Sequence, residues 1–181
     1  MFEVFICNTP FQLSYVDFII SEQKKNQTDY NYLIVSTLND HEERNNFVKI
    51  SKNIILFLYQ QQKIKKIIKN NYSIKGRNVF VTLPHTAGII TNFFYQYYSH
   101  NSNVRFNFYY EGLALFRKTN FKIRQSAIIY CIKICFFILN LFKPKEIFNL
   151  FPYSILNEST VYSPINHPFL KNSYNRVVII K

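Results

Sequence analysis

The sequence predicts an α/β fold, a Rossmann-like and mostly parallel sheet with helices on both faces. Three observations support this prediction. Short runs of β-branched and aromatic residues alternate with longer stretches of helical apolar spacing. The first such run passes directly into a helix start, as in a βαβ unit. The length of 181 residues suits one domain, and no repeat or linker divides it.

The opening of the chain gives the clearest pattern. Residues 2–7, FEVFIC, are rich in β-formers and predict a buried strand. Thr9 then suits a helix N-cap, Pro10 suits the first helical position, and Gln12 stands three residues after the cap. This spacing predicts a capping box. The helix is expected to end at residues 24–26, where the apolar pattern stops.

The alternation continues along the rest of the chain. Further strands are expected at 32–36, 78–83, 104–110, 161–162 and 177–180. Helices are expected from a polar start at 40–43 through Phe47 and Ile50 toward Ile68, from a Thr86 cap through Tyr97, and over 121–142. Four strand–helix repeats favour a parallel sheet with helices on its faces.

Ligands of such sheets bind beyond the carboxyl ends of the strands. This rule selects three loops, each of which directly follows a predicted strand: 8–10, 84–86 and 111–112. The His167-Pro168 pair has no hydrophobic strand immediately before it, so it is interpreted as part of a loop.

Glu111 is one of only three acidic residues after Arg44, and Gly112 lets the backbone approach a ligand closely. The aromatic residues just before Glu111 would lower the local dielectric and raise its pKa. A general base acting on a sugar hydroxyl needs these properties. A turn with a solvated or salt-bridged carboxylate explains the same residues equally well.

His85 stands between Pro84 and the predicted cap Thr86. A neutral imidazole there could hydrogen-bond a carboxylate or hydroxyl of an acceptor. A structural histidine that orients the loop is an equally good interpretation.

The formal net charge is +12. Residues 1–44 hold seven acidic and three basic side chains, a balance of −4, and the remaining residues hold three acidic and 19 basic side chains, a balance of +16. Such a charge favours anionic partners, namely nucleotides, nucleic acid, acidic glycans or a membrane face. The sequence contains no Walker A, GxGxxG, HExxH or GxSxG motif and no metal-ligand spacing.

The three cysteines form no CxxC motif, which favours buried, reduced thiols and a cytoplasmic protein. No signal-peptide pattern opens the chain. The apolar segment 127–142 contains Lys133 and is short for a membrane span. It is expected to be a packed helix, or a helix lying on the inner membrane face.

Two groups of motifs resemble a known family. The run FICNTPFQ at 5–12 resembles the first strand and turn of bacterial sialyltransferases that build capsules and lipooligosaccharides. The runs LPHT at 83–86, TNF at 91–93 and YEGL at 110–113 are similar to the polysialyltransferase-like branch. In that branch, a Pro-His element precedes a helix and an acidic-Gly motif follows the next strand.

The resemblance implies a GT-B glycosyltransferase that transfers sialic acid from CMP-sialic acid to a glycan hydroxyl with inversion, without a metal or other cofactor. Residues 1–176 would be the acceptor-side N-terminal domain, and 177–181 would begin a linker or a donor domain that this chain lacks. The resemblance places Glu111 as the base and His85 on the acceptor side. The candidate substrate-binding residues from the loops and the resemblance are Asn8, Thr9, Gln12, His85, Thr86 and Gly112.

Two other functions remain open at this point. The net charge and the interleaved aromatic and basic residues at 109–117 are compatible with a nucleic-acid-binding protein. A membrane-associated remnant that binds glycan without catalysis is compatible with the same residues.

Overall fold

The computed structural model describes a parallel sheet and the helical residues that cover it. The described residues are 2–27, 29–38, 45–51, 60, 64, 66–70, 79–84, 91, 94–95, 98, 103–110, 159–166 and 168–180. The polar start at 40–43 of one predicted helix and the whole predicted helix over 121–142 lie outside this part of the chain.

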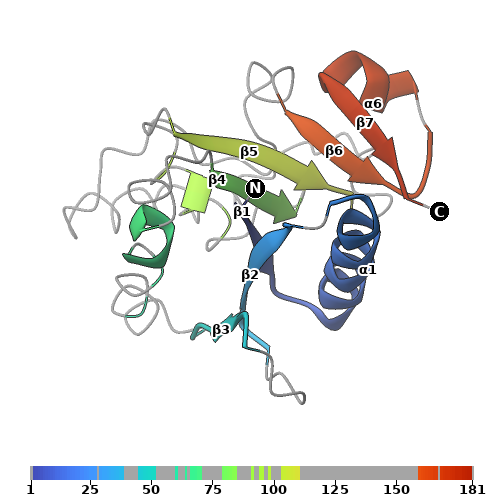
Figure 1. Cartoon of the computed structure of the whole chain (residues 1–181). Coiled ribbons are helices and arrows are strands. Elements are labelled where there is room, and N and C mark those ends of the chain that lie inside the picture. The colour runs from blue at the N-terminus through green and yellow to red at the C-terminus, as the bar shows by residue number, and fades with distance from the viewer. Residues whose placement is uncertain are drawn as a thin grey trace, which may run out of the picture.

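Seven strands form one sheet in which every pair of neighbours is parallel, in the order β3-β2-β1-β4-β5-β6-β7 (Figure 1). The strands are β1 (Phe2–Cys7), β2 (Asn31–Ser36), β3 (Phe47–Lys49), β4 (Val79–Pro84), β5 (Val104–Tyr109), β6 (Thr160–Ser163) and β7 (Arg176–Ile179). This architecture confirms the predicted α/β class and the parallel sheet, in the order typical of Rossmann-like folds.

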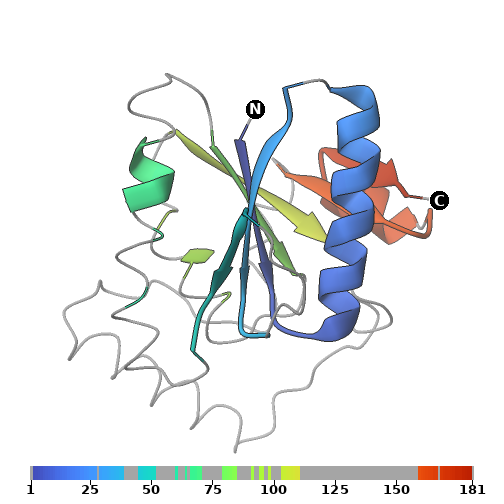
Figure 2. The same cartoon turned by 60° about the horizontal axis from the view of Figure 1, so that its bottom comes forward.

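Helices cover both faces of the sheet, as predicted. Helix α1 (Pro10–Asn26) lies on one face, and the helical residues 66–70 lie on the other (Figure 2). Helix α6 (Pro168–Ser173) shares the second face, because its Leu170 belongs to the same core cluster as Ile68. Right-handed crossovers place helices on opposite faces of a sheet when the chain reverses the direction in which it adds strands. Here the chain adds strands in one direction from β1 to β3 and in the opposite direction from β4 to β7.

The capping box of α1 is present as predicted. Thr9 is the N-cap in extended conformation, and its Oγ1 accepts a hydrogen bond from the Gln12 amide at 3.2 Å. Gln12 Oε1 accepts in return from the amides of Thr9 at 3.3 Å and Asn8 at 2.6 Å. Burial of Val16, Ile19 and Ile20 then holds the helix against the sheet.

Two local predictions were wrong. The helical spacing through Phe47 and Ile50 predicted a helix, but residues 47–49 form the edge strand β3. Its backbone pairs with β2 through Ile34 N–H to Asn46 O at 2.8 Å and Ile50 N–H to Ser36 O at 2.7 Å. Sheet pairing thus overrides the local pattern.

The second wrong prediction is the loop around His167-Pro168. Helix α6 begins at Pro168, so this residue belongs to a helix. Proline suits the first position of a helix because its missing N–H would have no partner there. The 176/177 boundary of the sequence prediction falls within β7, which pairs with β6 as part of the same sheet.

Candidate binding site at the carboxyl edge of the sheet

The topology places a switch point between β1 and β4. From β1 the chain builds the sheet outward through β2 to β3, and it then returns to the other side of β1 to add β4. In open parallel sheets, ligands bind in the crevice at the carboxyl ends of the strands at this point. The edge of the sheet beyond β1, β4 and β5 is called the carboxyl edge below.

The three loops selected from the sequence leave from this edge. They follow β1, β4 and β5, which are consecutive neighbours in the sheet. Pro84 and Tyr109, the last residues of β4 and β5, are register partners. The loop starts therefore lie side by side, although nothing in the sequence required these strands to be neighbours.

Only the first loop belongs to the described residues. Asn8, Thr9 and Gln12 are placed, whereas His85, Thr86, Glu111 and Gly112 lie outside the described part of the chain. The residue before Glu111 is anchored, because Tyr110 N–H donates to Tyr162 O at 2.9 Å. Tyr110 itself is only 4% exposed, so the β5 loop leaves from a buried and aromatic stretch.

Thr9 and Gln12 use their polar atoms in the capping box, so their clearest role is to shape the turn after β1. The turn is also held to the segment after β2, since Thr37 Oγ1 donates to Asn8 O at 3.4 Å. Asn8 Oδ1 differs from these atoms. It is buried and has no hydrogen-bond partner among the described residues. A buried carbonyl oxygen without a partner is costly, so this atom is suited to accept a hydrogen bond from a ligand.

An aromatic row connects α1 to β5 beside the same turn, and it consists of Phe11, Tyr15 and Tyr109. The rings of Phe11 and Tyr15 stack, with centroids 6.4 Å apart and planes at 6°. Tyr15 packs at a tilt on Tyr109, with centroids 6.1 Å apart. The Tyr109 hydroxyl donates to Ile6 O at 2.6 Å, which fixes the inner end of the row to β1.

The outer end of the row is open to solvent. Phe11 is 63% exposed, the largest exposure of any large hydrophobic residue in the described ranges. The Tyr15 hydroxyl is buried, has no partner within these ranges, and has a pKa raised by its burial. This row was not predicted from the sequence. The i, i+4 spacing of Phe11 and Tyr15 was a usable signal, but it does not reveal which side of a helix faces solvent.

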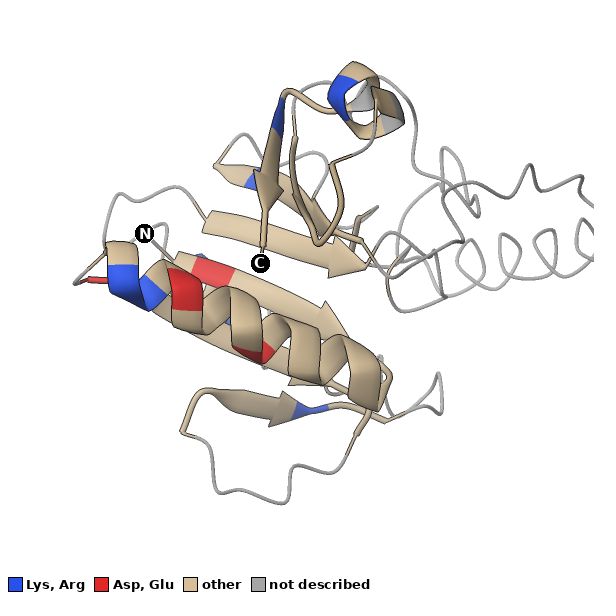
Figure 3. Ribbon diagram, turned by 90° about the vertical axis from the view of Figure 1, so that its right-hand side faces the viewer, with Lys and Arg blue, Asp and Glu red and all other residues tan. Residues whose placement is uncertain are grey.

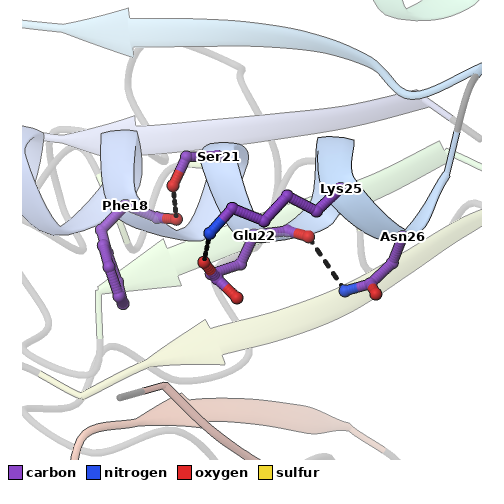
Figure 4. A network of polar contacts seen from close by, with 5 residues as sticks. All are labelled: Phe18, Ser21, Glu22, Lys25 and Asn26. Carbon is purple, nitrogen blue, oxygen red and sulfur yellow. Dashed lines mark hydrogen bonds and ion pairs between the residues drawn. The ribbon is translucent and has the colours of Figure 1, made fainter.

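The described residues named above in this part of the site carry no charge. The charged residues of α1 all lie beyond its first two turns, as the coloured ribbon shows (Figure 3). Near the far end of α1, the Lys25 ammonium pairs with Glu22 at 2.5 Å, and Asn26 Nδ2 donates to Glu22 O at 2.9 Å (Figure 4). The described beginning of the site therefore offers aromatic faces and neutral polar atoms. Much of the basic segment after Arg44 lies outside the described residues.

A second polar cluster lies inside the sheet, away from the carboxyl edge. Glu3 on β1 is completely buried on the α1 face. Its Oε2 accepts from the Tyr30 hydroxyl at 2.7 Å. Its Oε1 accepts from Thr82 on β4, from Asn107 on β5 at 3.4 Å and from the Tyr162 hydroxyl on β6 at 3.5 Å. These residues are called the Glu3 cluster.

Burial raises the pKa of the Glu3 carboxyl, and the four hydrogen bonds oppose that rise only in part. Because its side chain has no exposed surface, it has no direct access to a substrate. The sequence contained the signal that was missed: a glutamate within a strand that is otherwise apolar on both faces. A carboxyl group in that setting needs several partners from neighbouring strands.

Cys7, at the end of β1, is buried, which agrees with the expected buried position of this thiol. Within the described ranges, no three His, Cys, Asp or Glu side chains are grouped so that they could hold a metal ion. The helices in this part of the chain include none with the length and apolar character needed to cross a membrane. The segment 127–142 lies outside the described residues.

Comparison with known proteins gives no neighbour: no family model, curated protein or solved structure matches the chain. The function is therefore inferred from the fold, the carboxyl edge and the motifs that lead into this edge.

Proposed function

We propose that this chain is the acceptor-side domain of a sialyltransferase-like glycosyltransferase with a GT-B arrangement. The reaction is transfer of sialic acid from CMP-sialic acid to a glycan hydroxyl, for the synthesis of a bacterial capsule or lipooligosaccharide. One observation carries the proposal: the strands that lead into the three motif-bearing loops are consecutive in the sheet, at its switch point.

The sheet order supports this proposal because the motifs are distant in sequence. Residues 5–12, 83–86 and 110–113 resemble separate motifs of the sialyltransferase family. A chance resemblance would not require β1, β4 and β5 to be neighbours with parallel carboxyl ends. Their adjacency lets all three segments contribute to one binding site.

Glu111 is the proposed general base. It follows Tyr110, whose backbone is held to β6, and comes two residues after the fully buried Tyr109. Glu111 accepts the proton of the acceptor hydroxyl while that oxygen forms a bond to the anomeric carbon of sialic acid. The bond from this carbon to the phosphate oxygen breaks, and CMP leaves with the bonding electron pair. Aromatic surroundings would make a carboxylate a stronger base than it is in water.

His85 and Thr86 follow β4 directly and are proposed to bind the acceptor beside Glu111, with Gly112 allowing close approach of the backbone. Asn8 contributes a buried carbonyl oxygen from the β1 side. Thr9 and Gln12 hold that turn in place through the capping box. The proposed partners are thus an anionic glycan acceptor and CMP-sialic acid, at a cytoplasmic site that can include the inner membrane face.

The test is release of CMP from CMP-sialic acid in the presence of a glycan acceptor, measured with the complete enzyme that joins this acceptor-side domain to a donor domain. Replacement of the base by Glu111→Gln is expected to lower turnover by about a hundredfold or more and to leave acceptor affinity nearly unchanged. Glu22→Gln is the matched control, because it makes the same chemical change on the surface of α1. Equal turnover of both variants would refute the assignment of the base.

The same assay separates the other functions. Acceptor binding without CMP release would identify a glycan-binding protein that lacks catalysis. Tight, salt-sensitive binding to single-stranded nucleic acid, with no glycan binding, would favour a nucleic-acid-binding protein.

A further inference from the structure

We infer that Phe11 is a stacking platform for a sugar ring at the carboxyl edge. The inference rests on the proposed function in one respect, because it takes the ring to be part of the glycan acceptor. Nothing in the motif resemblance assigns a role to this phenylalanine side chain.

The position of Phe11 at the exposed end of the aromatic row supports this inference first. Phe11 is 63% exposed, whereas the ring behind it, Tyr15, packs on the fully buried Tyr109. Tyr109 is in turn hydrogen-bonded to the backbone of β1. The Phe11 ring therefore lies parallel and next to Tyr15, while its side chain presents much of its surface to solvent. A ring supported in this way loses little conformational freedom when a ligand stacks on it.

Two polar atoms from the same part of the chain provide the second support. Asn8 Oδ1 and the Tyr15 hydroxyl are both buried and without partners among the described residues. They come from the turn before Phe11 and from the next turn of the same helix. A sugar ring has an apolar C–H face for stacking, and hydroxyl groups at its rim would pair with these two atoms once the side chains that cover them move aside. Binding sites commonly combine an apolar wall with a few placed polar groups in this way.

The uncharged start of α1 provides the third support. The first two turns of α1 contain no charged residue (Figure 3). The donors of the capping box are already engaged, since the Gln12 amide bonds to Thr9 Oγ1 and the Thr9 amide bonds to Gln12 Oε1. This end of the helix is therefore poorly suited to bind a phosphate, and the platform favours a neutral sugar over the nucleotide part of the donor.

The test uses the absence of tryptophan from this protein. Phe11→Trp keeps an aromatic platform and introduces a single fluorescent indole. Phe18→Trp is the matched control, because Phe18 is an exposed phenylalanine about two turns further along α1. The probes are lactose, sialyllactose, CMP and an oligodeoxythymidylate, each titrated into the full-length variants.

The expected result is a saturable change in emission of the Phe11→Trp protein with lactose and sialyllactose, and no change for Phe18→Trp. In calorimetry, Phe11→Ala is expected to weaken saccharide binding about tenfold, while Phe18→Ala leaves it unchanged. Circular dichroism of each variant checks that the fold is retained. A response only to CMP or to the oligonucleotide would overturn the choice of ligand, and a response to neither saccharide would overturn the platform.

The results distinguish failure of the Phe11 platform from failure of the glycosyltransferase proposal. Saccharide binding that does not depend on Phe11 would overturn the platform and leave the glycosyltransferase proposal intact. A saccharide response at Phe11→Trp without any CMP release would support the platform and count against transferase activity. A change in emission with protein concentration alone would show that a second copy of the chain covers the ring, which also overturns the inference.

Discussion

Replacing Glu3 by glutamine is expected to remove a pH-dependent contribution to stability. The carboxyl group is completely buried and receives hydrogen bonds from Tyr30, Thr82, Asn107 and Tyr162. Glutamine has nearly the same shape and keeps a carbonyl oxygen for these donors. It has no ionised form, so it isolates the effect of the charge from the effect of packing.

The direction of the pKa shift decides whether the stability of the folded chain rises or falls with pH. Burial raises the pKa of Glu3 in the folded chain above its ordinary value of 4.5. Between these two pKa values, the folded chain binds more protons than the unfolded chain, and its stability must fall as the pH rises. One group contributes a slope of up to about 1.4 kcal/mol per pH unit in this window. The contribution is fully present below pH 4.5 and is lost as the pH passes the folded pKa.

The assay is urea unfolding of wild type and variants, followed by circular dichroism at a series of pH values. Near pH 4.5, where Glu3 is protonated in the folded chain, Glu3→Gln is expected to cost about 1 kcal/mol for altered hydrogen bonds. As the pH rises, the wild type should lose stability relative to Glu3→Gln. The difference between them should then shrink and can reverse.

Glu22→Gln is the control for this series, because Glu22 is 38% exposed in an i, i+3 ion pair with Lys25. Its replacement is expected to change stability by less than about 1 kcal/mol and to keep the wild-type pH dependence. A difference between wild type and Glu3→Gln that stays constant with pH would refute the reasoning. It would mean that Glu3 titrates alike in the folded and unfolded chains.

The remaining predictions concern the turn and the aromatic row. Thr9→Ala removes the N-cap of α1 and is expected to lower the free energy of unfolding by about 1 kcal/mol, whereas Ser14→Ala on the exposed side of the helix should cost less. Tyr109→Phe should cost about 1–2 kcal/mol, because it leaves Ile6 O without its buried donor. Tyr15→Phe removes a buried hydroxyl that has no partner among the described residues, so stability should stay constant or rise. Urea unfolding measures all of these changes, and an equal cost of the two tyrosine replacements would contradict the hydrogen-bond assignment.

The parts of the fold that could be predicted are those in which local and long-range preferences agree. In β1 and α1, β-formers, a capping box and an apolar helix face all favour the observed structure. The edge strand β3 could not be predicted, because three residues contain too little pattern to compete with the helical spacing around them. Its conformation depends on β2, which offers a free edge on that side.

Part of the candidate site could likewise be predicted from the sequence, and part could not. Strand ends could be recognised from the sequence, and the rule for parallel sheets then selected the loops. The order of the strands could not be derived, since alternation of strands and helices is compatible with several topologies. The exposure of Phe11 and the burial of Glu3 depend on which way each element faces, and that is decided by packing across the sheet.

The Glu3 cluster and the carboxyl edge are linked through the register of the sheet. The cluster joins β1, β4, β5 and β6, and three of these strands lead into the candidate site. A shift of one residue in β4 or β5 would turn Thr82 or Asn107 to the opposite face and leave the Glu3 carboxyl with a missing partner. The same shift would displace the start of the following loop by about 3.3 Å along the strand. Loss of a buried partner therefore opposes the displacements that would separate the loops, so a polar group inside the sheet helps to align a binding edge that it does not touch.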